Sequence, residues 1–151
     1  NGLTCWRRSK GQWPADSVPG SALLGDTMGE MALYYAAADI ALIGGSLRDF
    51  GAQNLIEACA VGTPVVLGPS TFNFAQAAAD ALACGAALQV RDADEAMRAM
   101  DGLCGDRPRL ASMAAAALQF AVSHRGATDR AARIARELLA GRPPRWTATR
   151  P

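Results

Sequence analysis

The sequence predicts an α/β protein built on a doubly wound parallel sheet. Short apolar runs without polar alternation, such as residues 40–45 and 64–68, are typical of parallel strands covered on both faces. Segments with helical periodicity separate these runs, and glycine or proline marks most of the boundaries between them. Strands and helices that alternate at such short range predict right-handed crossovers, with helices on both faces of the sheet.

The expected elements follow from these patterns in chain order. Strands are expected at residues 2–11, 22–25, 40–45, 64–68 and 86–90, with a Pro/Gly-rich loop at 12–21. Helices are expected at residues 26–39, 54–62, 70–85 and 92–104, followed by two more up to Leu139. Thr27 and Glu30 have capping-box spacing, which places the start of the first helix near Thr27. Asp92, Asp94 and Glu95 are expected to cap a helix rather than to form a paired-acid site.

Length and charge limit the domain organisation and the class of partner. The chain has 151 residues, half of them hydrophobic, which suits one domain at residues 1–140 and a flexible tail at 141–151. The net charge of +1 argues against a nucleic-acid-binding protein. The chain begins abruptly at Asn1, so we expect a piece of a longer protein. Whether the first strand–helix unit of the domain is included stays open.

Cysteine and histidine positions do not predict a metal site. The four cysteines lack metal-ligand or redox spacing, and His124 is the single histidine. Reduced thiols in a cytosolic setting are expected. Cys59, Cys84 and Cys104 lie in apolar helical patterns and are expected in the core. His124 is expected at the surface or at a helix end rather than in catalysis.

The carboxyl-terminal part of the chain is rich in arginine. From Asp106 onward, nine arginines accompany only three acidic residues. Two interpretations remain open for them: solvated helix faces, or a surface that lies near anionic lipid or another anionic ligand.

A glycine-rich segment follows the expected strand at 40–45. Gly44 and Gly45 allow a sharp turn and a close approach of ligand to backbone, and Ser46 adds a hydroxyl donor. Ligands of doubly wound sheets bind beyond the carboxyl ends of the strands. The next strand also ends in glycine, proline and hydroxyl residues at 68–71. We therefore expect the two strand ends to form one polar crevice.

The helix that follows begins with groups that suit a phosphate and a ribose. Gly51 precedes it, and the N–H groups of residues 52–54 are expected to be free to bind phosphate. Asn54 and Glu57 are three residues apart and share one helical face. A carboxylate only accepts hydrogen bonds, so Glu57 suits the vicinal hydroxyls of a ribose. A second interpretation also stays open, in which the glycines form a tight loop and Glu57 is a solvated helix residue.

Three segments of the chain resemble a known family. Residues 24–47, 54–57 and 62–74 are similar to the carboxyl-terminal domain of the bacterial 3-deoxy-D-manno-octulosonic acid (Kdo) transferases, and the likeness extends from about Trp6 to Leu139. The resemblance implies a Rossmann-like domain, the carboxyl-terminal half of a GT-B glycosyltransferase. The broader pattern is also similar to the donor halves of other two-domain glycosyltransferases.

The resemblance implies the following activity. The domain would bind the nucleotide sugar CMP-Kdo, without metal or cofactor. An amino-terminal domain outside this chain would hold the lipid A precursor and the catalytic base, so no catalytic residue is expected here. The whole enzyme would act in lipopolysaccharide biosynthesis, as a peripheral protein at the cytoplasmic face of the bacterial inner membrane.

Carried residue by residue, the resemblance also assigns the site. Glu57 would hold the ribose hydroxyls. The donor phosphate or the sugar carboxylate would lie near Ser46, Gln53 and Asn54. The cytidine would be bordered by Asp26, Thr27, Met28, Gly29 and Glu30, and the far wall would run from Ser70 to Asn73. The family often has histidine where this chain has Gln53, which cannot carry a positive charge.

Three further expectations remain to be tested. Met28 and Met31 are either core residues or part of a wall beside the base. Another GT-B donor domain, either of a UDP-sugar transferase or like that of UDP-GlcNAc 2-epimerase, is an alternative function, and a non-catalytic nucleotide-binding module is another. A domain cut from its partner is also expected to self-associate, through residues 1–24 or through the crevice side.

Overall fold

The computed structural model describes residues 3–11, 20–124 and 127–141. Its strands are β1 (Thr4–Arg7), β2 (Ser21–Leu24), β3 (Ala41–Ile43), β4 (Val65–Leu67) and β5 (Ala87–Gln89). Its α-helices are α1 (Met31–Ala37), α2 (Leu55–Ala60), α3 (Ala75–Ala83), α4 (Ala93–Gly105), α5 (Arg107–Ser123) and α6 (Ala127–Leu139). Short 3-10 helices lie at η1 (Arg8–Lys10), η2 (Gly44–Leu47) and η3 (Phe72–Phe74). The alternation of strand and helix agrees with the sequence pattern.

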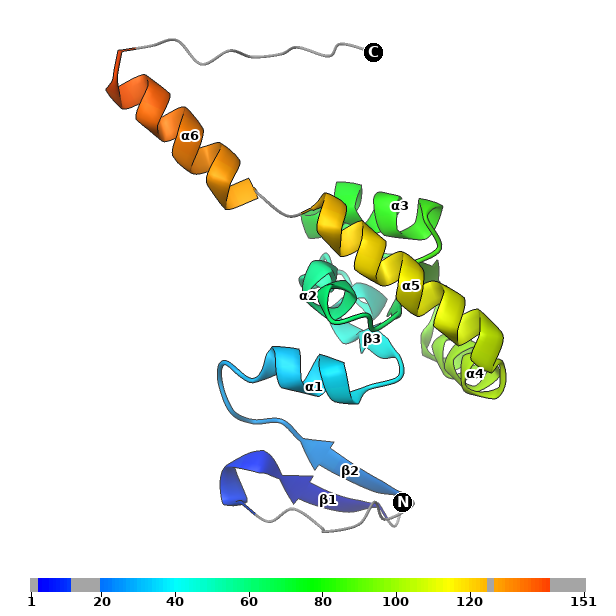
Figure 1. Cartoon of the computed structure of the whole chain (residues 1–151). Helices are drawn as coiled ribbons and strands as arrows, with labels where there is room; N and C mark the ends of the chain where they lie inside the picture. The colour runs from blue at the N-terminus through cyan, green and yellow to red at the C-terminus, as the bar shows by residue number, and fades with distance from the viewer. Residues whose placement is uncertain (1–2, 12–19, 125–126, 142–151) are drawn as a thin grey trace.

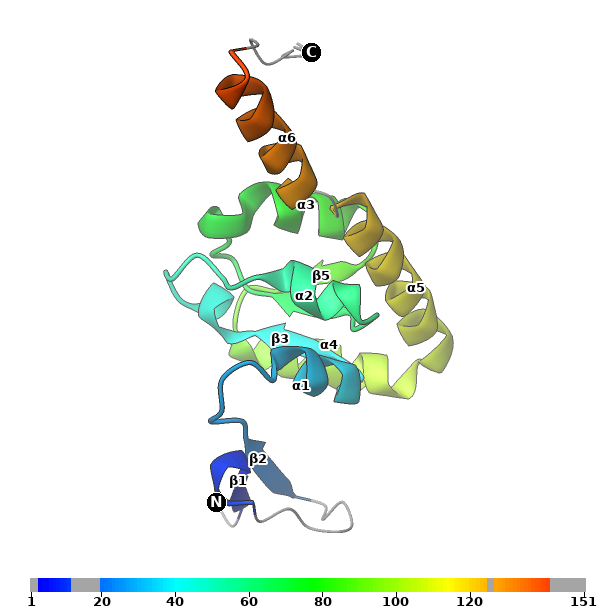
Figure 2. The same ribbon diagram turned by 60° about the vertical axis from the view of Figure 1, so that its left-hand side comes forward.

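The central sheet consists of β3, β4 and β5, all parallel and in that order. Val65 and Leu67 of β4 pack into one cluster with buried residues of α2, α3 and α5. Val66, which points the other way, packs with Ala96 of α4. In Figure 2, α2 lies in front of this sheet and α4 behind it. Helices therefore cover both faces, as the unbroken apolar strands predict, and the α/β fold class is confirmed.

β1 and β2 form a separate parallel pair, with Thr4 opposite Ser21 and Arg7 opposite Leu24. Figures 1 and 2 show this pair at one end of the molecule, with α1 between it and the central sheet. The prediction that all the strands join one sheet is wrong in this respect. Apolar runs locate strands, but they carry no information on which strands exchange hydrogen bonds.

The first helix begins later than predicted. Thr27 and Glu30 do contact each other, but through their side chains, and α1 begins at Met31 without a side-chain cap. Gly29 has a φ of +81°, and this left-handed backbone ends any helical path before Glu30. The prediction for the helix at 92–104 is confirmed, because the Asp92 side chain accepts a hydrogen bond from the Glu95 N–H at 2.8 Å.

The cysteines divide into buried and exposed positions. Cys59 is fully buried in the central core, and burial raises the pKa of its thiol to about 12. Cys84 and Cys104 are exposed, so their predicted place in the core is wrong. Both follow the last buried residue of their helix, at a point where the helical face has turned toward solvent.

α6 extends away from the rest of the molecule in Figures 1 and 2. Within residues 3–11, 20–124 and 127–141, no helix combines the length and the apolar character needed to cross a membrane. The same residues hold no cluster of three or more His, Cys, Asp or Glu side chains that could bind a metal ion. The predicted tail at 141–151 lies outside the described residues except for Gly141.

Candidate functional site

The carboxyl ends of β3 and β4 are joined through Ser46. This side chain is fully buried, and its hydroxyl donates to the Ile43 carbonyl at 2.5 Å and accepts from the Gly68 N–H at 2.6 Å. A Cβ on Gly68 would lie only 2.4 Å from the Ser46 carbonyl oxygen, so the two loops need glycine here. The sequence predicts Ser46 as a donor to ligand. The structure instead uses its hydroxyl inside the core, because both loops bend toward the same strand end.

Gln53 lies across the turn at Gly44 and Gly45. Its side-chain oxygen accepts a hydrogen bond from the Gly45 N–H at 3.2 Å. A Cβ on Gly45 would lie 2.2 Å from the Gln53 amide nitrogen, so this contact depends on glycine. Ala52, which directly precedes Gln53, is buried and has a φ of +69°, which is unusual for a residue with a side chain. Such strain is concentrated at functional loops.

Asn54 connects the start of α2 to Glu57. Its side-chain oxygen accepts from the Ile56 N–H at 3.1 Å, and its nitrogen donates to Glu57 Oε1 at 2.9 Å. The predicted shared face of Asn54 and Glu57 is therefore present. The contact with the Ile56 N–H caps the first turn of α2, two residues after Asn54, and this N–H is not one of the groups predicted to bind phosphate. The amides of residues 52–54 precede this capped group.

The segment from Ser70 to Asn73 braces the loop between η2 and α2. Ser70 Oγ accepts from the Gly51 N–H at 3.1 Å and donates to Asp49 Oδ1 at 3.4 Å. Asn73 Nδ2 donates to the Phe50 carbonyl at 2.9 Å. Between the two segments lies an open pocket of about 560 Å³, lined by Leu47, Arg48, Asp49, Pro69, Ser70, Thr71 and Phe72. A pocket therefore lies where the two strand ends were expected to form a crevice, although apolar side chains such as Leu47 and Phe72 line it together with polar ones.

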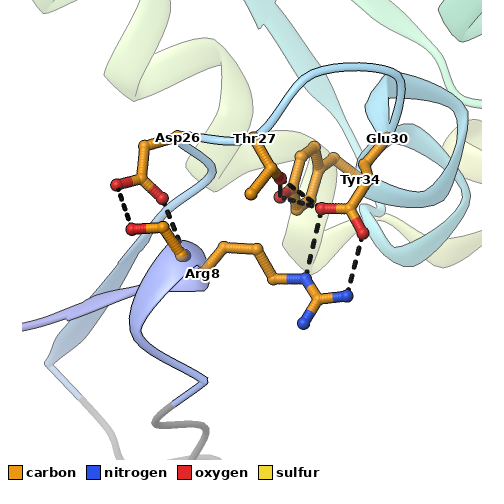
Figure 3. Close-up of polar contacts among 6 residues, drawn as sticks. Arg8, Asp26, Thr27, Glu30 and Tyr34 are labelled. Atoms are coloured by element: carbon orange, nitrogen blue, oxygen red, sulfur yellow. Dashed lines mark hydrogen bonds and ion pairs between the residues drawn. The ribbon is translucent and has the colours of Figure 1, made fainter.

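A second network holds the loop at residues 26–30 (Figure 3). Arg8 of η1 donates to Glu30 through Nε at 3.2 Å and through Nη2 at 2.8 Å. Thr27 and Tyr34 also donate to the Glu30 carboxylate. The hydrogen bonds from Thr27 and then Arg8 lower the pKa of Glu30 below its usual range.

Asp26 has its own partner in this network. The backbone N–H and the hydroxyl of Ser9 donate to its carboxylate at 2.9 and 2.7 Å. These bonds lower the pKa of Asp26. The carboxylates of Asp26 and Glu30 are thus held by residues of η1, about twenty positions earlier in the chain. Sequence reasoning missed Arg8 and Ser9, because no local motif links η1 to this loop, and it also missed Tyr34, which lies four residues after Glu30 in α1.

A pocket of about 420 Å³ lies between the 26–30 loop, the start of α1 and α2. It is lined by Gly29, Met31, Ala32, Glu57, Ala60 and Val61. The structure thus brings Glu57 beside the loop that was expected to border the cytidine. Met28 is 97% exposed and Met31 48%, so neither is a core residue. Met31 lines the pocket, and Met28 does not.

His124 lies apart from these pockets. Its Nε2 is 3.5 Å from Asp80 Oδ2, and its Nδ1 is 3.0 Å from the Phe120 carbonyl at the end of α5. This position fits the expected helix-end histidine. The pocket beside it, of about 430 Å³, is lined by residues of α3 and α5 and by His124 itself.

Comparisons with known proteins agree with the resemblance in the sequence. No protein-family model matches the chain. The chain is 51% identical over 130 residues to the 3-deoxy-D-manno-octulosonic acid transferase of Bordetella pertussis, which covers 85% of the chain and 30% of that protein. It is 33% identical over 125 residues to the transferase of the same name from Haemophilus influenzae, which covers 82% of the chain and 29% of that protein.

The chain is homologous to a segment of the Kdo transferases.

The structural comparison identifies the segment. The fold matches the crystal structure of the C-terminal CMP-Kdo binding domain of WaaA from Acinetobacter baumannii, with a TM-score of 0.71 and 28% identity. The match covers 78% of this chain and 61% of that one. The predicted fold, that of the Rossmann-like carboxyl-terminal half of a GT-B Kdo transferase, is therefore confirmed. The chain spans about 30% of the length of the Kdo transferases from Bordetella pertussis and Haemophilus influenzae.

Proposed function

We propose that this chain is the donor-binding domain of a Kdo transferase and that it binds CMP-Kdo. The proposal depends above all on the pocket that Gly29 and Glu57 line together. That pocket occurs in a chain whose structural neighbour is named a CMP-Kdo binding domain. The 51% identity to the Kdo transferase of Bordetella pertussis supports the same function.

The nucleoside is proposed to occupy this pocket. Glu57 is exposed and accepts one hydrogen bond from Asn54, which leaves lone pairs on its carboxylate for two ribose hydroxyls. The 26–30 loop would border the cytosine with Met28, Gly29 and its backbone. The carboxylates of Asp26 and Glu30 are engaged with η1, so their proposed role is to hold this loop.

The phosphate is proposed to lie beside Gly45, Gln53 and Asn54, with the far wall formed by Ser70 to Asn73. In the reaction, a hydroxyl of the acceptor would attack the anomeric carbon of Kdo. The bond from that carbon to the phosphate oxygen would break, and its electron pair would leave with CMP. Backbone N–H groups and neutral amides at the phosphate would stabilise the charge that develops there.

The rest of the activity is proposed for the longer protein. Its amino-terminal domain would bind the lipid A precursor and supply the base that takes the proton of the attacking hydroxyl. It would act in lipopolysaccharide biosynthesis, peripherally at the cytoplasmic face of the inner membrane, without metal or cofactor. The 151-residue chain alone would not transfer Kdo. The exposed side chains of Phe50 and Phe72, beside the crevice, support the proposed self-association.

Calorimetric titration with CMP and UDP tests the donor assignment. The wild-type chain is expected to bind CMP more tightly than UDP. Glu57→Gln is expected to weaken CMP binding by roughly 1.5–3 kcal/mol, because it removes charge-assisted hydrogen bonds to the ribose. Glu30→Gln, the matched control, is expected to weaken it less.

Three results would contradict the proposal in different ways. Tighter binding of UDP would favour the domain of a UDP-sugar enzyme. Binding of neither nucleotide would favour a non-catalytic interaction module. Equal CMP affinities for wild type and Glu57→Gln would remove the carboxylate from the site. Thermal unfolding of each variant shows whether the fold is intact.

A further inference from the structure

The donor proposed above carries two anionic groups. Besides its phosphate, Kdo is an octulosonic acid, so a carboxylate adjoins the anomeric carbon that is bonded to CMP. An ionised carboxylate that is taken out of water needs a cation or several hydrogen-bond donors. N–H groups and neutral amides of residues 44–54 can bind one of these anions, but no cation has yet been assigned to either.

The sequence offers few cations near this site. Arg48 is the only lysine, arginine or histidine between Lys10 and Arg91. Gln53, where the family often has histidine, is neutral and is engaged with the Gly45 N–H. Arg8 lies near the 26–30 loop, but its guanidinium is committed to Glu30. Among the described residues that line the pocket of about 560 Å³, Arg48 is the only cation.

The position of Arg48 and its lack of an ion pair within the described residues suit a contact with the sugar carboxylate. It follows η2 directly, is exposed, and lines the pocket of about 560 Å³ at the carboxyl ends of β3 and β4. Arg7, Arg8, Arg91 and Arg107 each form an ion pair with a carboxylate. Among the described residues, no ion pair of Arg48 is present, although Asp49 is its neighbour. The Asp49 carboxylate instead accepts the Ser70 hydroxyl.

We propose that Arg48 binds the carboxylate of the donor sugar and so selects an acidic over a neutral sugar. This proposal rests on the proposed function. Its guanidinium has the planar fork that matches a carboxylate. With this contact, the sugar would lie in the pocket that Arg48 and Phe72 line, and the nucleoside in the pocket at Glu57. Residues 47–49 of the 44–54 loop line the first pocket, and Glu57 follows this loop at the second, so the phosphate would lie along the loop.

Binding of CMP and of CMP-Kdo to the 151-residue chain tests the proposal. Arg48→Gln is expected to weaken CMP-Kdo binding about tenfold, the loss of one charge-assisted contact, and to change CMP binding less than about twofold. Arg48→Lys is expected to recover part of the loss, because the charge remains without the fork. Arg109→Gln, which removes an exposed arginine in the first turn of α5, is the control and should bind both ligands as wild type does.

The outcomes separate this proposal from the proposed function. If wild type binds CMP-Kdo and Arg48→Gln binds it equally well, the role of Arg48 is wrong and the donor domain stands. If Arg48→Gln loses the same affinity for CMP as for CMP-Kdo, Arg48 contacts the phosphate, and the proposed contact with the sugar carboxylate is wrong. If wild type binds neither ligand, the proposed function and this inference fail together. Equal thermal unfolding of the four proteins shows that the differences arise at the site.

Discussion

Two loops border the proposed donor site, and they are held in place by different means. The 26–30 loop is held by charged side chains that are partly exposed and whose partners lie in η1. The 44–54 loop is held by a buried hydroxyl, by backbone contacts and by uncharged amides. Exposed ion pairs contribute little to stability, whereas a buried polar group that loses its partner is costly. The 44–54 loop should therefore be the more sensitive to substitution, and the 26–30 loop to pH.

The largest effect is expected where the two strand ends touch. Gly68→Ala should lower the free energy of unfolding by about 3 kcal/mol, because the new methyl group would meet the Ser46 backbone at 2.4 Å. Gly102→Ala is the matched control, since no atom lies within 4 Å of its added Cβ. It sits inside α4 and should raise the stability by about 1 kcal/mol. Urea unfolding of both variants measures the difference, and equal effects would mean that the strand ends are not in contact.

A smaller effect is expected from the hydroxyl groups. Ser46→Ala should cost about 2 kcal/mol, because it leaves the buried Gly68 N–H without its acceptor. Ser9→Ala removes the hydroxyl that donates to Asp26 at an exposed site and should cost less than about 1 kcal/mol. Unfolding in urea compares them directly. A larger loss for Ser9 would reverse the comparison between the two loops.

The strain at Ala52 predicts a further contrast. Ala58 lies inside α2, so Ala58→Gly should cost about 1 kcal/mol through lost helix propensity. Ala52 has a left-handed backbone that glycine adopts more readily, so Ala52→Gly should be less destabilising than Ala58→Gly by about 1 kcal/mol. Both side chains are buried, which makes the pair a fair comparison. If the two glycines cost the same in thermal or urea unfolding, the strain at residue 52 contributes no free energy.

The smallest effect is expected from pH, at the 26–30 loop. Folding lowers the pKa of Glu30 below 4.5 and that of Asp26 below 3.8. The unfolded chain therefore takes up protons first as the pH falls. Stability from these groups is present above the ordinary values and is lost as the pH falls through the lowered pKa of each folded group.

The comparison of variants isolates this dependence. Glu30→Gln should show a shallower loss of stability below pH 4.5 than wild type in urea unfolding across pH. Ser46→Ala removes no titrating group and should keep the wild-type slope. A Glu30→Gln curve parallel to that of wild type would mean that the network with Arg8 does not hold the folded state.

Some features of this protein follow from the sequence alone, because they depend on nearest neighbours along the chain. The apolar runs that become β3, β4 and β5 are recognisable without the structure, since their side chains are buried on both faces. Asp92 caps its helix because its carboxylate reaches an N–H three residues away. Asn54 and Glu57 meet for the same local reason, because residues three apart share one face of a helix.

Other features were decided only by the tertiary structure, because their partners are distant in sequence. Ser46 was predicted to face a ligand, but Gly68, 22 positions later, draws its hydroxyl into the core. Arg8 reaches Glu30 across 22 positions, which turns an expected helix cap into a link between η1 and the 26–30 loop. The separate pairing of β1 with β2 is likewise invisible in a hydrophobic pattern. A hydrogen bond needs both groups at one point in space, and only the folded chain specifies which distant groups share that point.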